Sequence, residues 1–295
     1  MNKAQLRGSL ILLLATIIWG GAFVAQSVGL DYIPPFAFNG IRITLGGVCL
    51  IPVVLIHFKK HPEARPNTPK DRKQTLLAGL CCGLCLFAGS AFQQFGLISV
   101  DPGKAGFITS LYVVLVPVAQ LFFGHKGRWN LWAGVGLSVI GLFLLCVTGK
   151  LRIQTGDICL LMCGVCFTFH ILVVDHFSDR VDGVLMSILQ FFVAGFLCLF
   201  CMAIFEKPTL GGIWDAAIPI VYAGAFSCAM GYTFQIIGQK TTEPTIASII
   251  LALESVFAVL AGWIILGDTL TIREWFGCAL MMAAILIVQL PSIRE

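Results

Sequence analysis

Apolar residues in this chain form ten runs of roughly 17–25 residues, separated by short clusters of charged residues, glycine and proline. A helix of that length crosses a hydrocarbon core of roughly 30 Å. The expected spans are 8–28, 35–57, 75–97, 103–123, 129–148, 156–177, 183–205, 213–236, 245–266 and 272–290. Only the connection Phe58–Lys73 is long, as in a compact bundle. The pattern predicts an all-α integral membrane protein with ten transmembrane helices.

The two halves of the chain resemble each other. Matching positions, first half before second, are Gly8 and Gly156, Trp19 and Phe167, Arg42 and Gln190, Ala105 and Ala247, and Tyr112 and Glu254. This repeat predicts two units, 1–149 and 150–295, joined near Gly149–Gln154. Each unit has five spans, an odd number, so the second unit enters the membrane from the opposite side. Inverted repeats of this kind characterise secondary transporters, whose sites lie near the bilayer midplane.

Composition supports a membrane protein and sets its orientation. The chain is 58% hydrophobic and 12% charged, about half the charge of a soluble domain, with a mean hydropathy of +0.93. The net charge of +4 therefore gives no reason to expect nucleic acid. With both termini in the cytoplasm, 13 of the 19 Lys and Arg residues lie on the cytoplasmic side, as the positive-inside rule requires.

Glu254 is the strongest candidate for chemistry. It is the only charge in the apolar stretch 245–266, near the middle of the membrane. A carboxylate at that depth costs about 2.5–3.5 kcal/mol and is expected to face protein or a water-filled cavity. It is either a structural acid, hydrogen-bonded to a neighbouring helix, or a cavity carboxylate that binds a proton or a substrate cation. Both interpretations remain open on the sequence alone.

Arg42 lies inside the second span, with Asn39 on the same helical face. Its guanidinium would satisfy helix-end carbonyls or reach outward to the interface. Alternatively, it would bind an anionic group of a substrate or pair with Glu254. Gln190 occupies the matching place in the second half without the charge, so the two halves are not equivalent in function.

Aromatic and amide side chains complete the candidate cavity. Trp19, Tyr112 and Tyr232 would line it, although aromatic residues also pack membrane bundles generally. Gln94 is an uncharged polar group within a span, able either to bond a neighbouring helix or to orient a substrate.

The sixth span carries Cys159, Cys163, Cys166 and His170 on one helical face. Thiolates and imidazole bind soft metals, but one straight helix does not surround an ion, and closed sites draw on at least two segments. Cys81, Cys82 and Cys85 in the third span could supply a second segment. We therefore expect a packing seam and no metal or cofactor, with His170 alone a candidate to reach the cavity. Most of the 12 cysteines lie in apolar spans and act as packing residues.

Several motifs resemble a known family. They are Trp19-Gly20-Gly21-Ala22-Phe23-Val24 with Pro34-Pro35 and Arg42, Lys104-Ala105-Gly106-Phe107-Ile108-Thr109, and Ala252-Leu253-Glu254-Ser255-Val256-Phe257 with Leu266-Gly267-Asp268. Together they resemble two EamA domains of the drug/metabolite transporter superfamily. The resemblance implies a ten-helix carrier of the bacterial inner membrane, usually an exporter of amino acids, other metabolites or drugs.

The chain departs from that family in three places. The family often has Pro at the position of Ser255 and Glu at the position of Asp268. Its short multidrug relatives rely on a Glu in their first helix, and the span 8–28 has none. Their proton-exchange mechanism therefore does not carry over directly.

The sequence has no His-Glu-x-x-His, Gly-x-Ser-x-Gly or P-loop motif, so we do not expect an enzyme. The expected function is secondary transport of a small molecule, with lipids as the other partner. A lipid-handling protein such as a flippase, or an intramembrane enzyme, are the alternatives. The sequence leaves the oligomeric state open, a monomer included.

Overall fold

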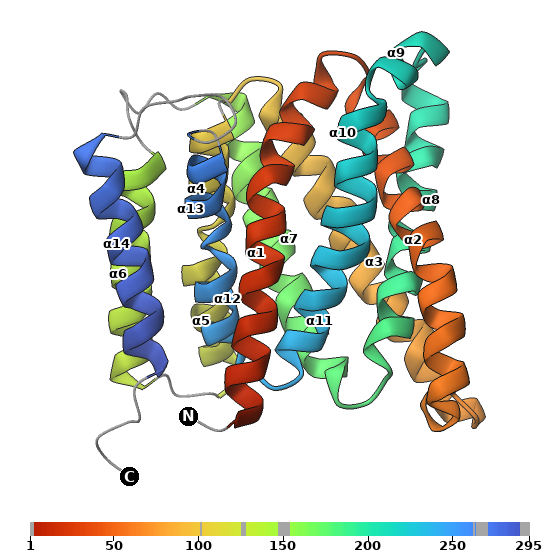
Figure 1. Ribbon diagram of the computed structural model, residues 1–295, viewed down its shortest axis with the longest axis horizontal. Helices are drawn as coiled ribbons and strands as arrows, with labels where there is room; N and C mark the ends of the chain where they lie inside the picture. The colour runs from red at the N-terminus through yellow and green to blue at the C-terminus, as the bar shows by residue number, and fades with distance from the viewer. Residues whose placement is uncertain are drawn as a thin grey trace.

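The computed structural model describes residues 3–100, 102–124, 128–146, 154–261, 263 and 271–289. These residues form a bundle of helices and connecting turns, without any β-strand among them (Figure 1). Most of the expected junction at Gly149–Gln154 lies outside the described residues, as does Asp268.

The helices follow the predicted spans closely. In the first half they are α1 Lys3–Leu30, α2 Pro35–Lys60, the short η1 Pro62–Ala64, α3 Pro69–Leu97, α4 Pro102–Thr109, α5 Tyr112–Phe122 and α6 Trp129–Cys146. In the second half they are α7 Thr155–Ser178, α8 Gly183–Phe205, α9 Leu210–Asp215, α10 Ala217–Val221, the π-helical η2 Tyr222–Tyr232, α11 Thr233–Gln239, α12 Pro244–Leu251, α13 Glu254–Ala261 and α14 Ile272–Gln289.

By length and composition, eight helical segments of the described chain can cross a membrane. They are α1, α2, α3, α4 with α5, α7, α8, α10 to α11, and α12 with α13. The apolar helix at Trp129–Leu145 is shorter than these eight, and α14 is not among them. α6 and α14 pack against each other at one end of the bundle (Figure 1). The structure thus describes a multi-pass membrane bundle.

The helices of the two halves interlock. α1 packs against η2 and α11 of the second half, and α7 packs against α3 of the first. Glycines permit both approaches, because a Cβ on Gly8 would lie 2.7 Å from the carbonyl oxygen of Gly238. Likewise, a Cβ on Gly156 would lie 2.9 Å from the carbonyl oxygen of Gly96. Gly8 and Gly156 are matching positions of the sequence repeat, so the same close contact between the halves occurs twice.

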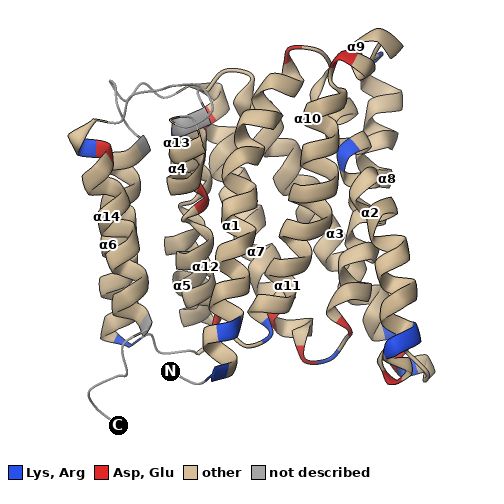
Figure 2. Ribbon diagram, in the orientation of Figure 1, with Lys and Arg blue, Asp and Glu red and all other residues tan. Residues whose placement is uncertain are grey.

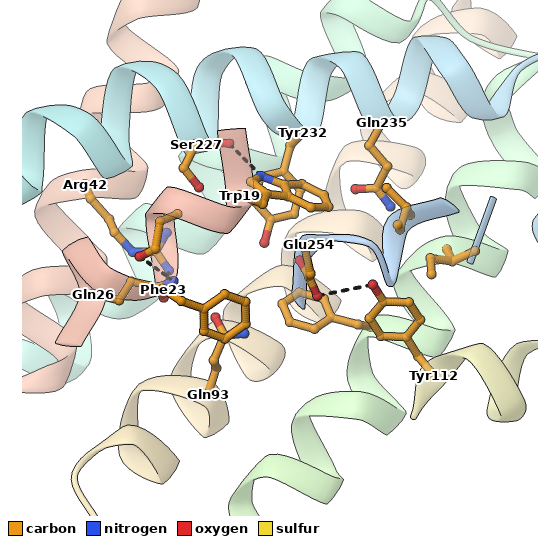
Figure 3. Close-up of a pocket in the computed structure, with 14 residues that line it drawn as sticks. Trp19, Phe23, Gln26, Arg42, Gln93, Tyr112, Ser227, Tyr232, Gln235 and Glu254 are labelled. Atoms are coloured by element: carbon orange, nitrogen blue, oxygen red, sulfur yellow. Dashed lines mark hydrogen bonds between the residues drawn. The ribbon is translucent and has the colours of Figure 1, made fainter. Parts of the chain in front are cut away.

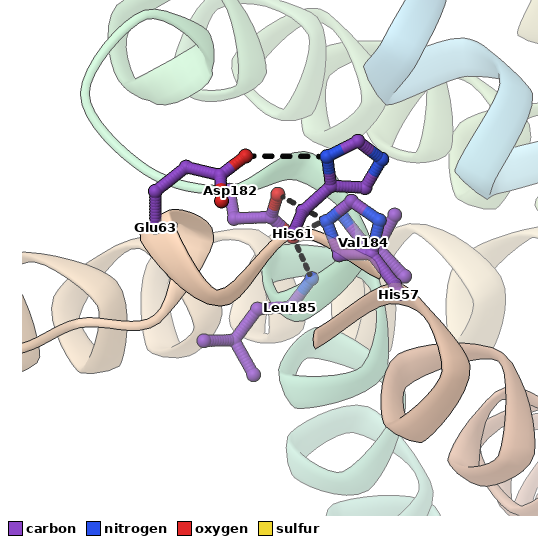
Figure 4. Close-up of polar contacts among 6 residues, drawn as sticks. All are labelled: His57, His61, Glu63, Asp182, Val184 and Leu185. Atoms are coloured by element: carbon purple, nitrogen blue, oxygen red, sulfur yellow. Dashed lines mark hydrogen bonds and ion pairs between the residues drawn. The ribbon is translucent and has the colours of Figure 1, made fainter. Parts of the chain in front are cut away.

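α2 and α8 are tied together at both ends. At the start of α2, the Glu206 carboxylate accepts hydrogen bonds from the backbone amides of Phe36 (2.9 Å) and Ala37 (2.8 Å). At the other end, His57 Nε2 lies 2.8 Å from Asp182, which also caps the first turn of α8 (Figure 4). The two helices therefore run antiparallel, and each end of the pair is held by one carboxylate.

Two spans are interrupted near their middle. The helix breaks between Thr109 and Tyr112, and again between Leu251 and Glu254. Pro117 lies inside α5, beyond the first interruption. Turn-like backbone hydrogen bonds bridge both interruptions, such as Val113 N–H to the Ser110 carbonyl at 3.0 Å and Ser255 N–H to the Ala252 carbonyl at 3.3 Å. The backbone therefore stays hydrogen-bonded through them, as membrane depth requires.

Charged residues gather at the two ends of the bundle (Figure 2). Lys and Arg are concentrated at the end where α1 begins and where the segment between α2 and α3 lies. The opposite end, around α9 and the start of α14, carries fewer. The long sides of the bundle are largely uncharged, as a lipid-facing surface requires.

Candidate functional site

A narrow cavity lies where the two halves meet (Figure 3). It is lined by Trp19, Ala22, Phe23, Gln26, Arg42, Gln93, Tyr112, Phe167, Ile171, Ser227, Tyr232, Gln235, Leu251 and Glu254. These residues come from α1, α2, α3, α5 and α7, and from the spans that contain η2 and α13. α6 and α14 contribute none of them. The walls combine aromatic rings with a few polar groups, which is the usual character of a small-molecule site.

Glu254 forms the acidic side of the cavity. It starts α13 directly after the helix break and is only 7% exposed. The Tyr112 hydroxyl donates a hydrogen bond to Glu254 Oε1 at 3.2 Å, and the Ser110 hydroxyl donates one at 3.5 Å. Both donors lie at the break of the other interrupted span. Tyr112 and Glu254, matching positions in the sequence repeat, therefore meet at the centre of the molecule.

Arg42 forms the basic side of the cavity. Its guanidinium donates from Nε to Asn39 Oδ1 at 2.8 Å and from Nη2 to Gln26 Oε1 at 3.2 Å. Nη1 lies 3.5 Å from the Cys228 sulfur. The ion pairs of the described residues do not include Arg42 with Glu254, so that alternative is wrong for this conformation.

Arg42 also meets neither of the structural expectations, which were contact with the interface and with helix-end carbonyls. Arg42 is 2% exposed, and its partners are side chains within the bundle. It therefore neither extends to the interface nor satisfies helix-end carbonyls. Neutral oxygens hold the guanidinium in place without cancelling its charge. The cavity consequently carries one cationic group and one carboxyl group on different walls.

Aromatic rings form the wall between these two groups. Trp19 donates from Nε1 to the backbone carbonyl of Ser227 at 3.1 Å, which fixes the indole against η2. Its ring lies 4.7 Å from that of Tyr232, centroid to centroid. Trp19, Tyr112 and Tyr232 all line the cavity. Their rigid rings would contact a substrate with little loss of conformational entropy.

Four of the predicted site residues lie behind the lining. Asn39 accepts from Arg42 and donates to the backbone carbonyl of Ser90 at 2.9 Å. Gln94 donates to the backbone carbonyl of Gln26 at 3.1 Å. His170 and Gln190 bond each other at 2.8 Å, and both are fully buried between α7 and α8. His170 is not among the residues that line the cavity.

Sequence reasoning missed several residues of this site. Gln26 lines the cavity and holds Arg42, and it lies seven residues, about two turns, after Trp19 on the same face of α1. Ser110 also went unnoticed, because short hydroxyl residues are common in membrane helices, and Ser255 was noted only as a departure from the family. The signal available for Gln26 was an amide in a span otherwise free of charge.

In the part of the chain that the structure describes, no group of three or more His, Cys, Asp and Glu side chains is arranged to hold a metal ion. The described cysteines, including Cys159, Cys163 and Cys166 on α7, are free thiols.

Comparison with known proteins identifies relatives over the whole chain. The model of the EamA-like transporter family matches residues 6–147 and again 154–290. An uncharacterized transporter of Archaeoglobus fulgidus is 30% identical over 287 residues, covering 97% of this chain and 87% of the relative. The uncharacterized transporter YoaV of Bacillus subtilis is 26% identical, covering 92% of both chains.

Two further comparisons agree with these. The uncharacterized inner membrane transporter YedA of Escherichia coli is 25% identical, covering 93% of this chain and 88% of YedA. One solved crystal structure superposes with a TM-score of 0.81 at 18% identity, covering 99% of this chain and 100% of that one, and this likeness shows the fold. The two consecutive family matches, together with the membrane bundle, establish that the chain belongs to the EamA-like transporter family of the drug/metabolite transporter type.

Proposed function

We propose that this protein is a secondary transporter that exports a small metabolite, such as an amino acid or a drug-like compound, across the bacterial inner membrane. It works by alternating access, in which the cavity opens to one side of the membrane at a time. The inner-membrane location is supported by the relative YedA, which is named for it. Transport is driven by a gradient of the substrate or of an ion, because the sequence has no nucleotide-binding motif.

The central cavity, with Arg42 and Glu254 on its walls, is the observation that carries this proposal. Residues from seven spans line it, and this favours a central chamber over a groove along the lipid-facing side. That arrangement suits a solute that leaves the membrane phase entirely. A lipid flippase instead needs a polar path open sideways to the bilayer, and it is the less favoured function.

Alternating access requires that the two halves of the protein move relative to each other. The helix packing supports ten helices arranged as two inverted repeats of five, residues 1–149 and 150–295. The repeat matches α1 with α7, α2 with α8, and α3 with the span that contains η2 and α11. In agreement with this, α1 packs against α11 as α7 packs against α3, and α2 packs against η2 as α8 packs against α3. The breaks before Tyr112 and Glu254 are likewise matched. α6 and α14, the fifth and tenth helices in this scheme, pack antiparallel outside the cavity.

The charge distribution supports an orientation with both termini in the cytoplasm. The end of the bundle richer in Lys and Arg is the one where α1 begins (Figure 2). The long segment between α2 and α3 then faces the cytoplasm. The partners of the protein in this scheme are the small-molecule substrate and the membrane lipids, with no nucleic acid.

A transport screen in proteoliposomes tests the proposal. Purified protein is reconstituted into vesicles that are loaded with amino acids and small metabolites. Solute efflux and lipid scrambling are then measured in parallel. We expect saturable flux of at least one solute and no scrambling above protein-free vesicles. Scrambling without any solute flux would reverse the choice between carrier and flippase.

A further inference from the structure

Four side-chain oxygen donors gather where the two broken spans meet. They are the Glu254 carboxylate and the hydroxyls of Ser110, Tyr112 and Ser255. Ser110 Oγ lies 3.5 Å from Glu254 Oε1 and 3.2 Å from Ser255 Oγ, while the Tyr112 hydroxyl lies 3.2 Å from Glu254 Oε1. All four residues are buried.

These separations are long for hydrogen bonds between oxygens, which usually span about 2.7–2.8 Å. They instead match the spacing of oxygens around a hard cation. Ligand oxygens at about 2.4 Å from an ion, neighbouring each other in an octahedron, lie about 3.4 Å apart. The three separations, Ser110 to Glu254, Ser110 to Ser255 and Tyr112 to Glu254, are therefore compatible with neighbouring ligands of one ion as well as with hydrogen bonds.

The charge of the cluster favours a monovalent ion. Glu254 is the only carboxylate in it, so one positive charge balances the site and a divalent ion would leave an excess charge in the membrane interior. Hard oxygen donors also favour an alkali ion over a soft metal. In other transporters, Na⁺ is coordinated at helix breaks by unwound backbone carbonyls and half-helix C-terminal ends. Here the carboxylate and the hydroxyls supply the oxygens.

From this geometry we propose that Ser110, Tyr112, Glu254 and Ser255 form a Na⁺ site at the meeting point of the two broken spans. The Ser255 hydroxyl, 3.2 Å from Ser110 Oγ, adds an oxygen next to the carboxylate of Glu254 in the chain.

The site gives the cavity a means of coupling. An ionised Glu254 and the Arg42 guanidinium make the empty cavity neutral. Bound Na⁺ then leaves one positive charge, which an anionic group of the substrate on Arg42 balances. Ion and substrate therefore favour each other's binding. This coupling rests on the proposed carrier function, whereas binding of Na⁺ itself does not.

Binding of radioactive ²²Na⁺ to the purified protein in detergent, with choline holding the ionic strength constant, tests the proposal. We expect saturable binding of Na⁺ with a dissociation constant of about 1–10 mM. Glu254→Gln should abolish it, and Ser110→Ala and Ser255→Ala should each weaken it about tenfold, or roughly 1.4 kcal/mol. Ser138→Ala on α6, outside the cavity, is the matched control and should leave it unchanged.

Two outcomes overturn the site. One is the lack of saturable Na⁺ binding by a protein that still transports solute, which leaves the carrier function standing. The other is Na⁺ binding that persists in both serine variants and in Glu254→Gln, because the ion would then bind at another place in the protein. If the protein binds Na⁺ saturably, loses this binding in the variants and shows no solute flux, the Na⁺ site is retained and the proposed carrier function is rejected. Because the serine variants remove single hydroxyl groups, they decide the question even where Glu254→Gln fails to fold.

Discussion

At the scale of single residues, the cavity separates a cation from a carboxyl group. Arg42 is held by the neutral oxygens of Asn39 and Gln26, and Glu254 by hydroxyls. Neither charge is cancelled by an ion pair within the part of the chain that the structure describes. Both therefore remain available to a substrate or an ion.

Arg42→Gln should lower the flux of a carboxylate-bearing substrate, though less than tenfold. The amide keeps hydrogen-bonding capacity near Asn39 and Gln26 but loses the positive charge. We expect the loss mainly as a higher KM, because ground-state binding weakens. Initial rates in proteoliposomes, compared for a substrate and its uncharged amide, provide the measurement. Lys207→Gln, an exposed cation outside the cavity, is the control.

An equal loss of flux for the carboxylate and the amide would contradict this role, since it would show that charge recognition is not what Arg42 supplies.

The sequence was sufficient to select both charged residues, because a charge in an apolar span stands out. It did not reveal their partners. Arg42 and Gln26 are on different helices, and nothing in the order of residues indicates that they touch. His170 was misjudged for the same reason, since its bond to Gln190 turns it away from the cavity lining.

At the scale of elements, the carboxylates that join α2 to α8 hold the two halves together. Glu206 satisfies two amides at the start of α2, which begins at Pro35 and has no side-chain cap of its own. His57 and Asp182 tie the opposite end (Figure 4). The spans were predictable from apolar length, but this cross-connection was not, because it joins residues about 125 to 170 positions apart.

Glu206→Ala should destabilise the protein by about 1–2 kcal/mol, because it leaves backbone amides at a helix start without their acceptor. Thermal unfolding in detergent measures the change as a lower Tm. Glu206→Gln should lose less, since its carbonyl still accepts one hydrogen bond. Glu63→Ala removes a far more exposed acid and is the control.

Unfolding temperatures of Glu206→Ala and Glu63→Ala that agree within error would show that the contact at the start of α2 adds nothing to stability.

At the scale of the whole molecule, the internal repeat explains why Tyr112 and Glu254 meet. In the proposed inverted repeat, matching positions approach each other only near the axis between the two halves, and both residues follow matching helix breaks. The repeat was visible in the sequence. The breaks were not, because in apolar runs such as 245–266 only the structure shows where the helix is interrupted.

The proposed topology predicts how surface cysteines react. In a background whose native cysteines are replaced, Gln154→Cys should react with a membrane-impermeant maleimide added to intact cells. Lys70→Cys, in the segment between α2 and α3, should react only after the membrane is permeabilised. The reverse pattern would place both termini outside the cytoplasm.

Glu254 decides the central claim that a solute passes through the chamber between the halves. Glu254→Gln preserves size and removes the charge, so the fold should persist while any step that needs a carboxylate is lost. We predict near-normal expression and unfolding temperature, with flux lowered at least about tenfold, equivalent to roughly 1.4 kcal/mol on the limiting step. Normal flux in a well-folded Glu254→Gln protein would contradict the account, and a misfolded one would make Glu254 a structural acid.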